Sequence, residues 1–391
     1  MSISIVPDFS ESEAPRPTAN NQIVTSMSDV ALQIPTAIVY CEGQFGALDG
    51  KTANGLVRHS EKYEIVSVID SQKSGLDAGE VLDNMPNEIP ICDNLANAIQ
   101  KFGTTPAYFI FGLAPASGML SVHERSVVLE AVRRGINIVS GLHEFLNDDP
   151  EIYAASVANK VRLLDIRKPR AKKDLRVFSG QIKTVTCPRI AILGTDCAIG
   201  KRTTATILNR LLNECGLKSV MIGTGQTGLM QGARYGIALD AVPSQFCCGE
   251  LEATVIEAFE RESPDVIIVE GQGALSHPAY STSSFILRGS CPNAVILQHA
   301  PGRSARCDFQ DMPMPTPDSE IALIQTFSDT KVIGVTINHE NLSQEEADEY
   351  ATRYEKEFGI PSTDPLTRPE RLLKMVFSAF PQIGVNLAAS V

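Results

Sequence analysis

The segment ILGTDCAIGKRTTATILNRLL, residues 192–212, narrows the choice of fold more than any other part of this chain. An apolar run leads into a loop between Gly194 and Gly200, and Lys201 then opens a stretch with apolar residues at helical spacing. Successive backbone N–H groups of such a loop point inward, and the helix N-terminus adds positive potential. The segment therefore predicts the strand, phosphate-binding loop and helix of an α/β protein.

The loop has five residues between its glycines where the usual loop has four, and it also departs from the usual pattern directly after its lysine. A Ser or Thr normally follows the lysine and binds Mg²⁺, but Arg202 stands there, and Thr203 lies about 100° further round the helix. The planar guanidinium matches phosphate oxygens instead. We expect phosphate binding, without deciding whether phosphate is cleaved, by Gly194, Thr195, Asp196, Gly200, Lys201, Arg202, Thr203 and Thr204.

Two further segments end buried strands with chemically useful residues. In DVIIVEGQGALSHPAYS, residues 265–281, Glu270 occupies the position of a Walker-B acid and His277 follows in a loop. Glu270 is predicted to orient a metal or a water, to act as a base, or simply to bond backbone amides. In MIGTGQTGLMQGARYG, residues 221–236, closely spaced glycines indicate a close approach of backbone to a ligand or to another loop. Glu250 and Glu252, which follow this segment, are expected at a helix N-terminus.

The N-terminal half repeats the order strand, turn, helix, strand. From residue 36 an apolar run meets a glycine-rich turn, a helix is expected near Lys51, and a second apolar run ends at Asp70. This is the order of a Rossmann-type unit, in which Asp70 meets a ribose, but the glycine spacing is not GxGxxG and a plain glycine-rich turn is the alternative. The repeated order predicts parallel sheets with both faces covered.

Two domains follow from these patterns. We expect a flexible N-terminal arm at residues 1–34, a Rossmann-like domain at 35–165, a basic linker at 166–180 and a P-loop NTPase-like domain at 181–391. The linker is either solvated or forms a basic edge that attracts a phosphate-bearing ligand.

Composition restricts the partners. The net charge of −12 disfavours nucleic acid and anionic membrane surfaces. Nine cysteines without a CxxC pair indicate reduced thiols. No apolar run reaches membrane-spanning length, and the first residues do not have the basic and apolar regions expected of a signal peptide. We therefore expect a cytoplasmic protein with small-molecule substrates that forms a homo-oligomer.

The three motifs GTDCAIGKRTT, GTGQTGLMQGARYG and EGQGALSHPAYS, with CEGQFGALDGKTANGL and IVSGLHEFLNDDPEI upstream, resemble the D-glutamate N-acetyltransferase family. That family was formerly catalogued as a domain of unknown function, with a Rossmann-like domain followed by a P-loop domain. The resemblance spans about residues 35–385, and Arg202 departs from the family's common GKMTT. It implies that acetyl-CoA is the donor and that the loop anchors its phosphates.

Under this resemblance Glu270 and His277 become the candidate general bases, and Gln226, Arg234 and Gln272 the candidate partners of the two carboxylates of D-glutamate. No metal ligand and no metal requirement are predicted. The loop GTDxxxGK also resembles that of dethiobiotin synthetase, so the alternative is an ATP- and Mg²⁺-dependent enzyme that activates a carboxylate or carbamate. A nucleotide-binding module without chemistry is the third reading.

Overall fold

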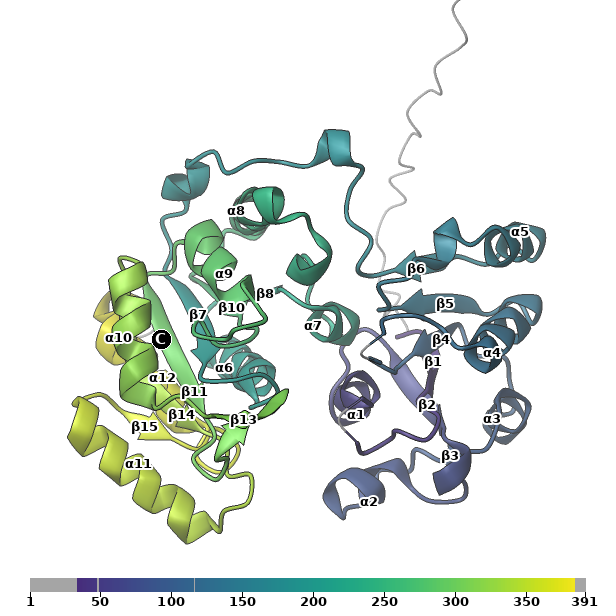
Figure 1. Ribbon diagram of the computed structural model, residues 1–391, viewed down its shortest axis with the longest axis horizontal. Helices are drawn as coiled ribbons and strands as arrows, with labels where there is room; N and C mark the ends of the chain where they lie inside the picture. Colours follow the sequence, from purple (N-terminus) through teal and green to yellow (C-terminus); the bar gives the residue numbers. More distant parts are fainter. Residues whose placement is uncertain (1–33, 48, 116, 384–391) are drawn as a thin grey trace, which may run out of the picture. The chain divides into compact units, whose positions relative to one another are not determined.

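The structure is a computed structural model that describes residues 34–47, 49–115 and 117–383. The predicted flexible arm, residues 1–34, lies outside the described residues except for Ile34. The described residues belong to one compact unit, and they contain two parallel sheets and a short antiparallel ribbon (Figure 1). The predicted α/β class with parallel sheets is confirmed.

The first sheet has the strand order β3-β2-β1-β4-β5-β6 with every pair parallel, which is the order of a Rossmann fold. Its strands are β1 (Thr36–Tyr40), β2 (Glu64–Ile69), β3 (Ile91–Cys92), β4 (Tyr108–Phe111), β5 (Asn137–Ser140) and β6 (Leu163–Asp165). Its helices are α1 (Lys51–Arg58), α2 (Ala78–Asp83), α3 (Leu95–Phe102), α4 (Val122–Arg133) and α5 (Pro150–Ala158). A helix begins at Lys51, as predicted.

The turn after β1 is braced by Asp70. Its carboxylate accepts hydrogen bonds from Gly43 N–H and Phe45 N–H, both at 3.1 Å, and Asp70 is fully buried. Gly43 has φ +68°, a conformation that favours glycine. Asp70 thus satisfies the backbone of a glycine-rich turn, the alternative to a ribose-binding acid.

The second sheet has the order β15-β14-β11-β7-β10-β8-β9, again with parallel pairs. Its strands are β7 (Arg189–Gly194), β8 (Ser219–Gly223), β9 (Tyr235–Gly236), β10 (Val266–Glu270), β11 (Ala294–His299), β14 (Lys331–Ile337) and β15 (Ser362–Thr363). The strands β12 (Ala305–Arg306) and β13 (Phe309–Pro313) form the antiparallel ribbon. The helices are α6 (Lys201–Glu214), α7 (Gln226–Gln231), α8 (Ser244–Glu262), α9 (Thr282–Ser290), α10 (Pro317–Phe327), α11 (Gln344–Phe358) and α12 (Glu370–Ala379).

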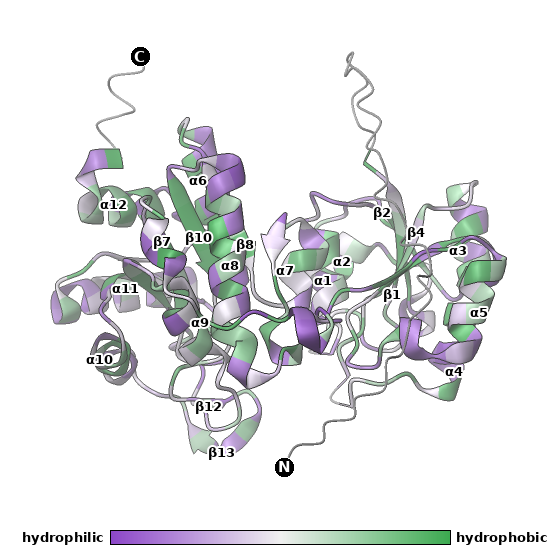
Figure 2. Cartoon of the chain, turned by 90° about the horizontal axis from the view of Figure 1, so that it is seen from above, coloured by the Kyte–Doolittle hydropathy of each residue, from purple (hydrophilic) through white to green (hydrophobic). Residues whose placement is uncertain are grey.

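Alternate residues of β7 enter different hydrophobic cores, because successive side chains of a strand point to opposite faces. Ile190 and Ile192 pack with the apolar face of α6 and with α12. Ala191 and Leu193 belong to the cluster that contains apolar residues of α8 and α9. The sheet is therefore covered on both faces, and in Figure 2 α6 and α8 show hydrophobic as well as hydrophilic residues.

One expectation about helix ends was wrong. Glu250 and Glu252 lie inside α8, which begins at Ser244. Both carboxylates are buried and hold the segment that links the two sheets: Glu250 accepts from Arg176 N–H at 2.7 Å, and Glu252 accepts from Ile182 N–H at 3.0 Å. Buried carboxylates of α8 therefore hold the linker segment in place by accepting hydrogen bonds from its backbone. No helix among the described residues is long and apolar enough to cross a membrane.

Candidate functional site

The phosphate-binding loop connects β7 to α6 at the carboxyl edge of the second sheet. Thr195 anchors it to β11: its N–H donates to Gln298 O at 3.1 Å, and its hydroxyl lies 2.8 Å from His299 Nδ1. Gly200 adopts φ +95° directly before the helix. Within the described part of the chain, the N–H groups of residues 197–200 donate to no backbone acceptor, which suits an anion-binding loop.

Lys201 crosses the loop from the first turn of α6. Its side chain is buried and Nζ donates to the carbonyl of Asp196. Burial lowers the pKa of Lys201, and nearby thiols and carboxylates oppose that shift. An incoming phosphate would compete with the Asp196 carbonyl for this ammonium group, which is the expected behaviour of a loop lysine.

The three residues after Lys201 have different surroundings. Burial lowers the pKa of Arg202 while Glu270 raises it, and a Cβ on Gly55 of α1 would lie 2.8 Å from Arg202 Nη2. Arg202 therefore lies beside α1 and in the field of Glu270. Thr203 is exposed, whereas the Thr204 hydroxyl donates to Gln298 Oε1 at 2.6 Å.

Glu270 ends β10, the strand next to β7. It is buried, and Oε2 accepts a hydrogen bond from Thr224 N–H at 3.0 Å. A Cβ on Gly228 would collide with this carboxylate, so the glycine-rich segment after β8 makes room for Glu270. Burial raises the pKa of Glu270, and Arg202 with the Thr224 N–H offsets part of the rise. A raised carboxyl pKa is a property of catalytic bases.

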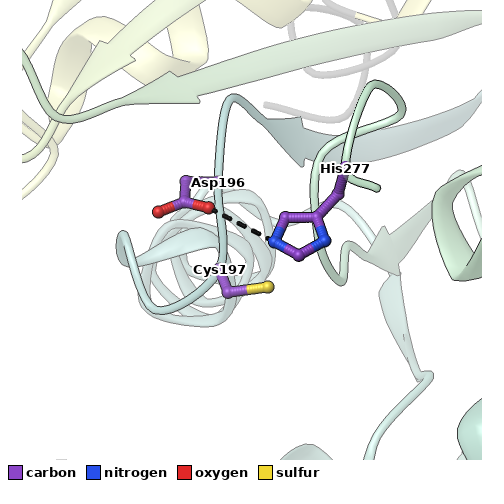
Figure 3. Close-up of side chains that lie close together, drawn as sticks. All are labelled: Asp196, Cys197 and His277. Carbon is purple, nitrogen blue, oxygen red and sulfur yellow. Dashed lines mark ion pairs between the residues drawn. The ribbon is translucent and has the colours of Figure 1, made fainter. Parts of the chain in front are cut away.

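His277 faces the loop from the segment after β10. Figure 3 shows its ring beside Asp196 and Cys197, with His277 Nε2 at 3.8 Å from Asp196 Oδ1. The ring stacks on Tyr280 with centroids 4.5 Å apart. Burial lowers the pKa of His277, and Arg306 lowers it further. His277 and Glu270 thus both lie close to the phosphate-binding loop, His277 beside Asp196 and Glu270 near Lys201.

The three predicted substrate-binding residues separate into two groups. Gln226 Nε2 donates to Thr52 Oγ1 at 3.2 Å, and Gln272 Nε2 donates to Thr224 Oγ1 at the same distance, so both lie near the end of β8. Arg234 instead pairs with Glu262 at 2.6 Å, and three quarters of its side chain is exposed. Arg234 lines two cavities of about 240 and 310 Å³, neither of which includes a loop residue.

One group of site residues was missed from the sequence. Arg303 donates to Asp196 Oδ2 at 3.1 Å and Cys307 N–H donates to the same oxygen at 2.8 Å. Both lie in the segment GRSARCDF, residues 302–309, which begins shortly after β11 ends at His299. Polar residues that follow a strand at the carboxyl edge of a parallel sheet are the signal that could have found them.

Comparison with known families agrees with this architecture. Residues 71–169 match the Rossmann-like domain of unknown function DUF1611_N, and residues 176–373 match the P-loop domain of unknown function DUF1611_C. The chain belongs to the DUF1611 family. The resemblance expected from the sequence motifs is confirmed.

Two curated relatives of this DUF1611 protein carry the name D-glutamate N-acetyltransferase. One, from Pseudoalteromonas sp., is 32% identical over 264 residues, which are 66% of this chain and 77% of the relative. The other, from Tritonibacter scottomollicae, is 31% identical over 262 residues, or 66% of this chain and 76% of the relative. A crystal structure of a DUF1611 family protein from Anabaena variabilis has a TM-score of 0.81 and 29% identity, and covers 89% of this chain and 99% of that one.

Proposed function

We propose that this DUF1611 protein is an N-acetyltransferase that moves the acetyl group of acetyl-CoA to the amino group of D-glutamate. The observation that carries the proposal is the similarity to the two relatives named D-glutamate N-acetyltransferase, which extends over about three quarters of their length. In this reaction the amine nitrogen bonds to the thioester carbon, the carbon–sulfur bond breaks, coenzyme A leaves as the thiolate, and a base takes the amine proton.

The phosphate-binding loop is assigned to the donor. Coenzyme A carries a pyrophosphate and a further phosphate, so a loop with free N–H groups and Lys201 suits it without any hydrolysis. The thioester lies at the far end of the pantetheine arm from these phosphates. A donor held in this loop must therefore fold its arm back if its thioester is to reach a residue at the loop.

Two base candidates remain at the loop. Glu270 is supported by its raised pKa and its place at the carboxyl end of β10. His277 is supported by an imidazole Nε2 without a hydrogen-bond partner among the described residues. For the acceptor, Gln226 and Gln272 offer amides near Glu270, and Oε1 of Gln226 is buried without a partner in the described part of the chain.

A second function has one observation in its favour. Glu270 lies on the strand next to β7 and interacts electrostatically with Lys201, as a Walker-B acid does in an ATP-cleaving enzyme. An ATP- and Mg²⁺-dependent enzyme that activates a carboxylate would use the same loop and the same acid.

A paired assay separates the two functions. The protein is incubated with D-glutamate and either acetyl-CoA or ATP with Mg²⁺, and released thiol and inorganic phosphate are followed together. We expect thiol release that depends on D-glutamate, with N-acetylglutamate as product and no phosphate. L-glutamate serves as the matched acceptor. Release of phosphate without thiol would support the ATP-dependent enzyme and contradict acetyl transfer.

A further inference from the structure

A cluster of metal-binding side chains lies beside the phosphate-binding loop. A carboxylate oxygen of Asp196, the Cys197 Sγ and a ring nitrogen of His277 all lie within 4.8 Å of one another. Cys197 also belongs to a second such group, with Cys307 and Asp308. The five side chains come from three segments: the loop itself, the turn after β10 and the ribbon between β12 and β13.

Two atoms of the cluster are buried without a partner. Asp196 Oδ1 and His277 Nε2 have no hydrogen-bond partner among the described residues, and both side chains are 0% exposed. They face each other at 3.8 Å, too far for a direct hydrogen bond. Asp308 Oδ2 lies 3.9 Å from the same Nε2. Because burying unpaired polar atoms is costly, a species that bonds to both atoms would stabilise the arrangement.

The spacing fits a tetrahedral metal ion. Zinc–ligand bonds of about 2.0–2.3 Å place ligand atoms about 3.3–3.8 Å apart. The His277–Asp196 separation of 3.8 Å lies at the upper end of this range and the His277–Asp308 separation of 3.9 Å just beyond it, so small side-chain rotations suffice. A thiolate, an imidazole and a carboxylate together are a donor set for Zn²⁺ or a similar borderline cation, not for Mg²⁺.

The surroundings also prepare these ligands. Arg303 and Cys307 N–H occupy Asp196 Oδ2, which leaves Oδ1 for another partner. Tyr280 and Phe309 hold the His277 ring, with centroids 4.5 and 5.8 Å away. Contacts of this kind orient metal ligands.

One contact must be given up when a metal binds. His277 Nδ1 accepts a hydrogen bond from Ala279 N–H at 3.3 Å. Ligation through Nε2 would put the ring proton on Nδ1 and break that bond. The bond is long and joins residues close in sequence, so the metal–nitrogen bond replaces a weak interaction.

We propose that Asp196, Cys197 and His277 bind one divalent cation of the zinc class, with Cys307 or Asp308 as the fourth ligand. The cation ties the phosphate-binding loop to the turn after β10 and to the β12–β13 ribbon. The site needs no bound substrate, but it bears on the proposed reaction: His277 Nε2 cannot hold the cation and also accept a proton, so a bound cation leaves Glu270 as the general base.

Cobalt substitution of the full-length protein tests the site directly. The chelator-treated protein is titrated with Zn²⁺ or Co²⁺ without nucleotide or coenzyme A, and bound metal is measured by elemental analysis. We expect one tightly bound ion per chain. The Co²⁺ form should show the intense visible bands of a tetrahedral centre and a near-ultraviolet thiolate charge-transfer band.

Variants identify the ligands. Cys197→Ser should remove or strongly weaken the charge-transfer band, and Asp196→Asn or His277→Asn should weaken Zn²⁺ binding at least about tenfold. Cys215→Ser is the matched control, because Cys215 lies at the other end of α6, about 20 Å from the loop. His123→Asn in α4 controls for histidine. Circular dichroism establishes that each variant is folded.

Three results would overturn the proposal. The first is less than about half an equivalent of bound metal in the wild-type protein, which needs no variant to interpret. The second is a weak octahedral Co²⁺ spectrum without a charge-transfer band. The third is an equal loss of binding in Cys215→Ser and Cys197→Ser.

Discussion

At the scale of single residues, Glu270 illustrates how burial decides chemistry. Its carboxylate is enclosed by the Thr224 N–H and by Gly228, in the field of Arg202 and Lys201. Burial raises its pKa in spite of these two cations. A carboxylate with a raised pKa takes up a proton more readily than an exposed one, so the surroundings of Glu270 suit a base.

Replacement of Glu270 by Gln tests this role. Gln keeps the shape but removes the charge, so we expect turnover with acetyl-CoA and D-glutamate to fall by about 10²–10⁴-fold. Steady-state kinetics measure the change. Glu252→Gln is the matched control, because Glu252 is also a buried carboxylate that accepts backbone hydrogen bonds but lies on α8. Near-normal turnover in a folded Glu270→Gln protein would assign this carboxylate a structural role.

Sequence patterns predicted the loop residues but not their partners. Lys201 and Gly200 follow from local spacing, because the loop is contiguous in sequence. The contact between Asp196 and Arg303 depends on the pairing of β7 with β11, which no local pattern specifies. The proximity of Cys197 and His277 could not be predicted for the same reason, because the two residues become neighbours only when the sheet forms.

At the scale of elements, long buried strands and amphipathic helices were predicted well. The longer strands of both sheets and the helix after the loop follow from the pattern of hydrophobic residues, whereas strands of two or three residues, such as β3 and β6, give no such signal. The predicted start of α8 was wrong. The first turns of this helix contain Cys247 and Cys248 rather than an evident capping signal, and no side chain caps it. Two acids that resemble a helix start instead bind the linker.

The start of α5 allows a test with a defined pH dependence. Asp149 caps this helix by accepting from Glu151 N–H and Ile152 N–H at 2.9 Å, and it pairs with Arg125 at 2.8 Å. Burial alone would raise the pKa of Asp149, but the hydrogen bonds from Ile152 and Arg125 outweigh it, so the net shift is downward. The charged form therefore stabilises the fold.

Asp149→Asn keeps a capping oxygen and removes the charge, so we expect a loss of about 1 kcal/mol in stability at pH 7. Because the pKa is lowered on folding, this contribution is present above the unfolded pKa of about 3.9 and is lost as the pH falls through the folded value. Urea unfolding at pH 7 and at acid pH measures it. The half-exposed pair of Arg58 and Asp83 supplies a control, Asp83→Asn, which should change stability by less than about 0.5 kcal/mol.

The two variants are compared by the stability that each loses relative to the wild type. If Asp149→Asn exceeded Asp83→Asn in this loss by the same amount from pH 7 to below pH 3, the result would contradict the assignment. It would mean that the carboxylate of Asp149 contributes through its shape and hydrogen bonds alone, because only a charge effect disappears on protonation.

At the scale of the whole molecule, α1, a helix of the first sheet, contacts α7, a helix of the second sheet. Thr52 Oγ1 and Thr227 Oγ1 lie 3.1 Å apart, and Gln231 Nε2 donates to His59 O at 2.9 Å. The glycine-rich segment after β8 therefore contacts α1, a helix of the first sheet, through its side chains. The order of the strands in each sheet was beyond prediction, because it depends on which distant segments pair.

Whether the reaction needs Mg²⁺ depends on whether bonds change at the phosphates of the bound substrate or far from them. An ATP-cleaving enzyme needs Mg²⁺ to neutralise the transferring phosphoryl group. Acetyl transfer has no such need, because the phosphates only anchor the donor while bonds change at the distant thioester. Arg202 also replaces the hydroxyl that would hold Mg²⁺, and Thr204 is already bonded to Gln298.

We therefore expect the rate of acetyl transfer to be the same, within about twofold, in Mg²⁺-free buffer and with Mg²⁺ added in excess. Thiol release measures this rate. Omission of Mg²⁺ is preferable to a strong chelator, because a chelator would also remove a zinc-class ion from Asp196, Cys197 and His277. Arg202→Ser is the companion variant: it should raise the KM for acetyl-CoA more than it changes kcat, because the role proposed for Arg202 is to offset phosphate charge, away from the thioester. A rate that disappears without Mg²⁺ and returns on its addition would make the loop a metal–nucleotide site and would contradict its use as an anchor for coenzyme A.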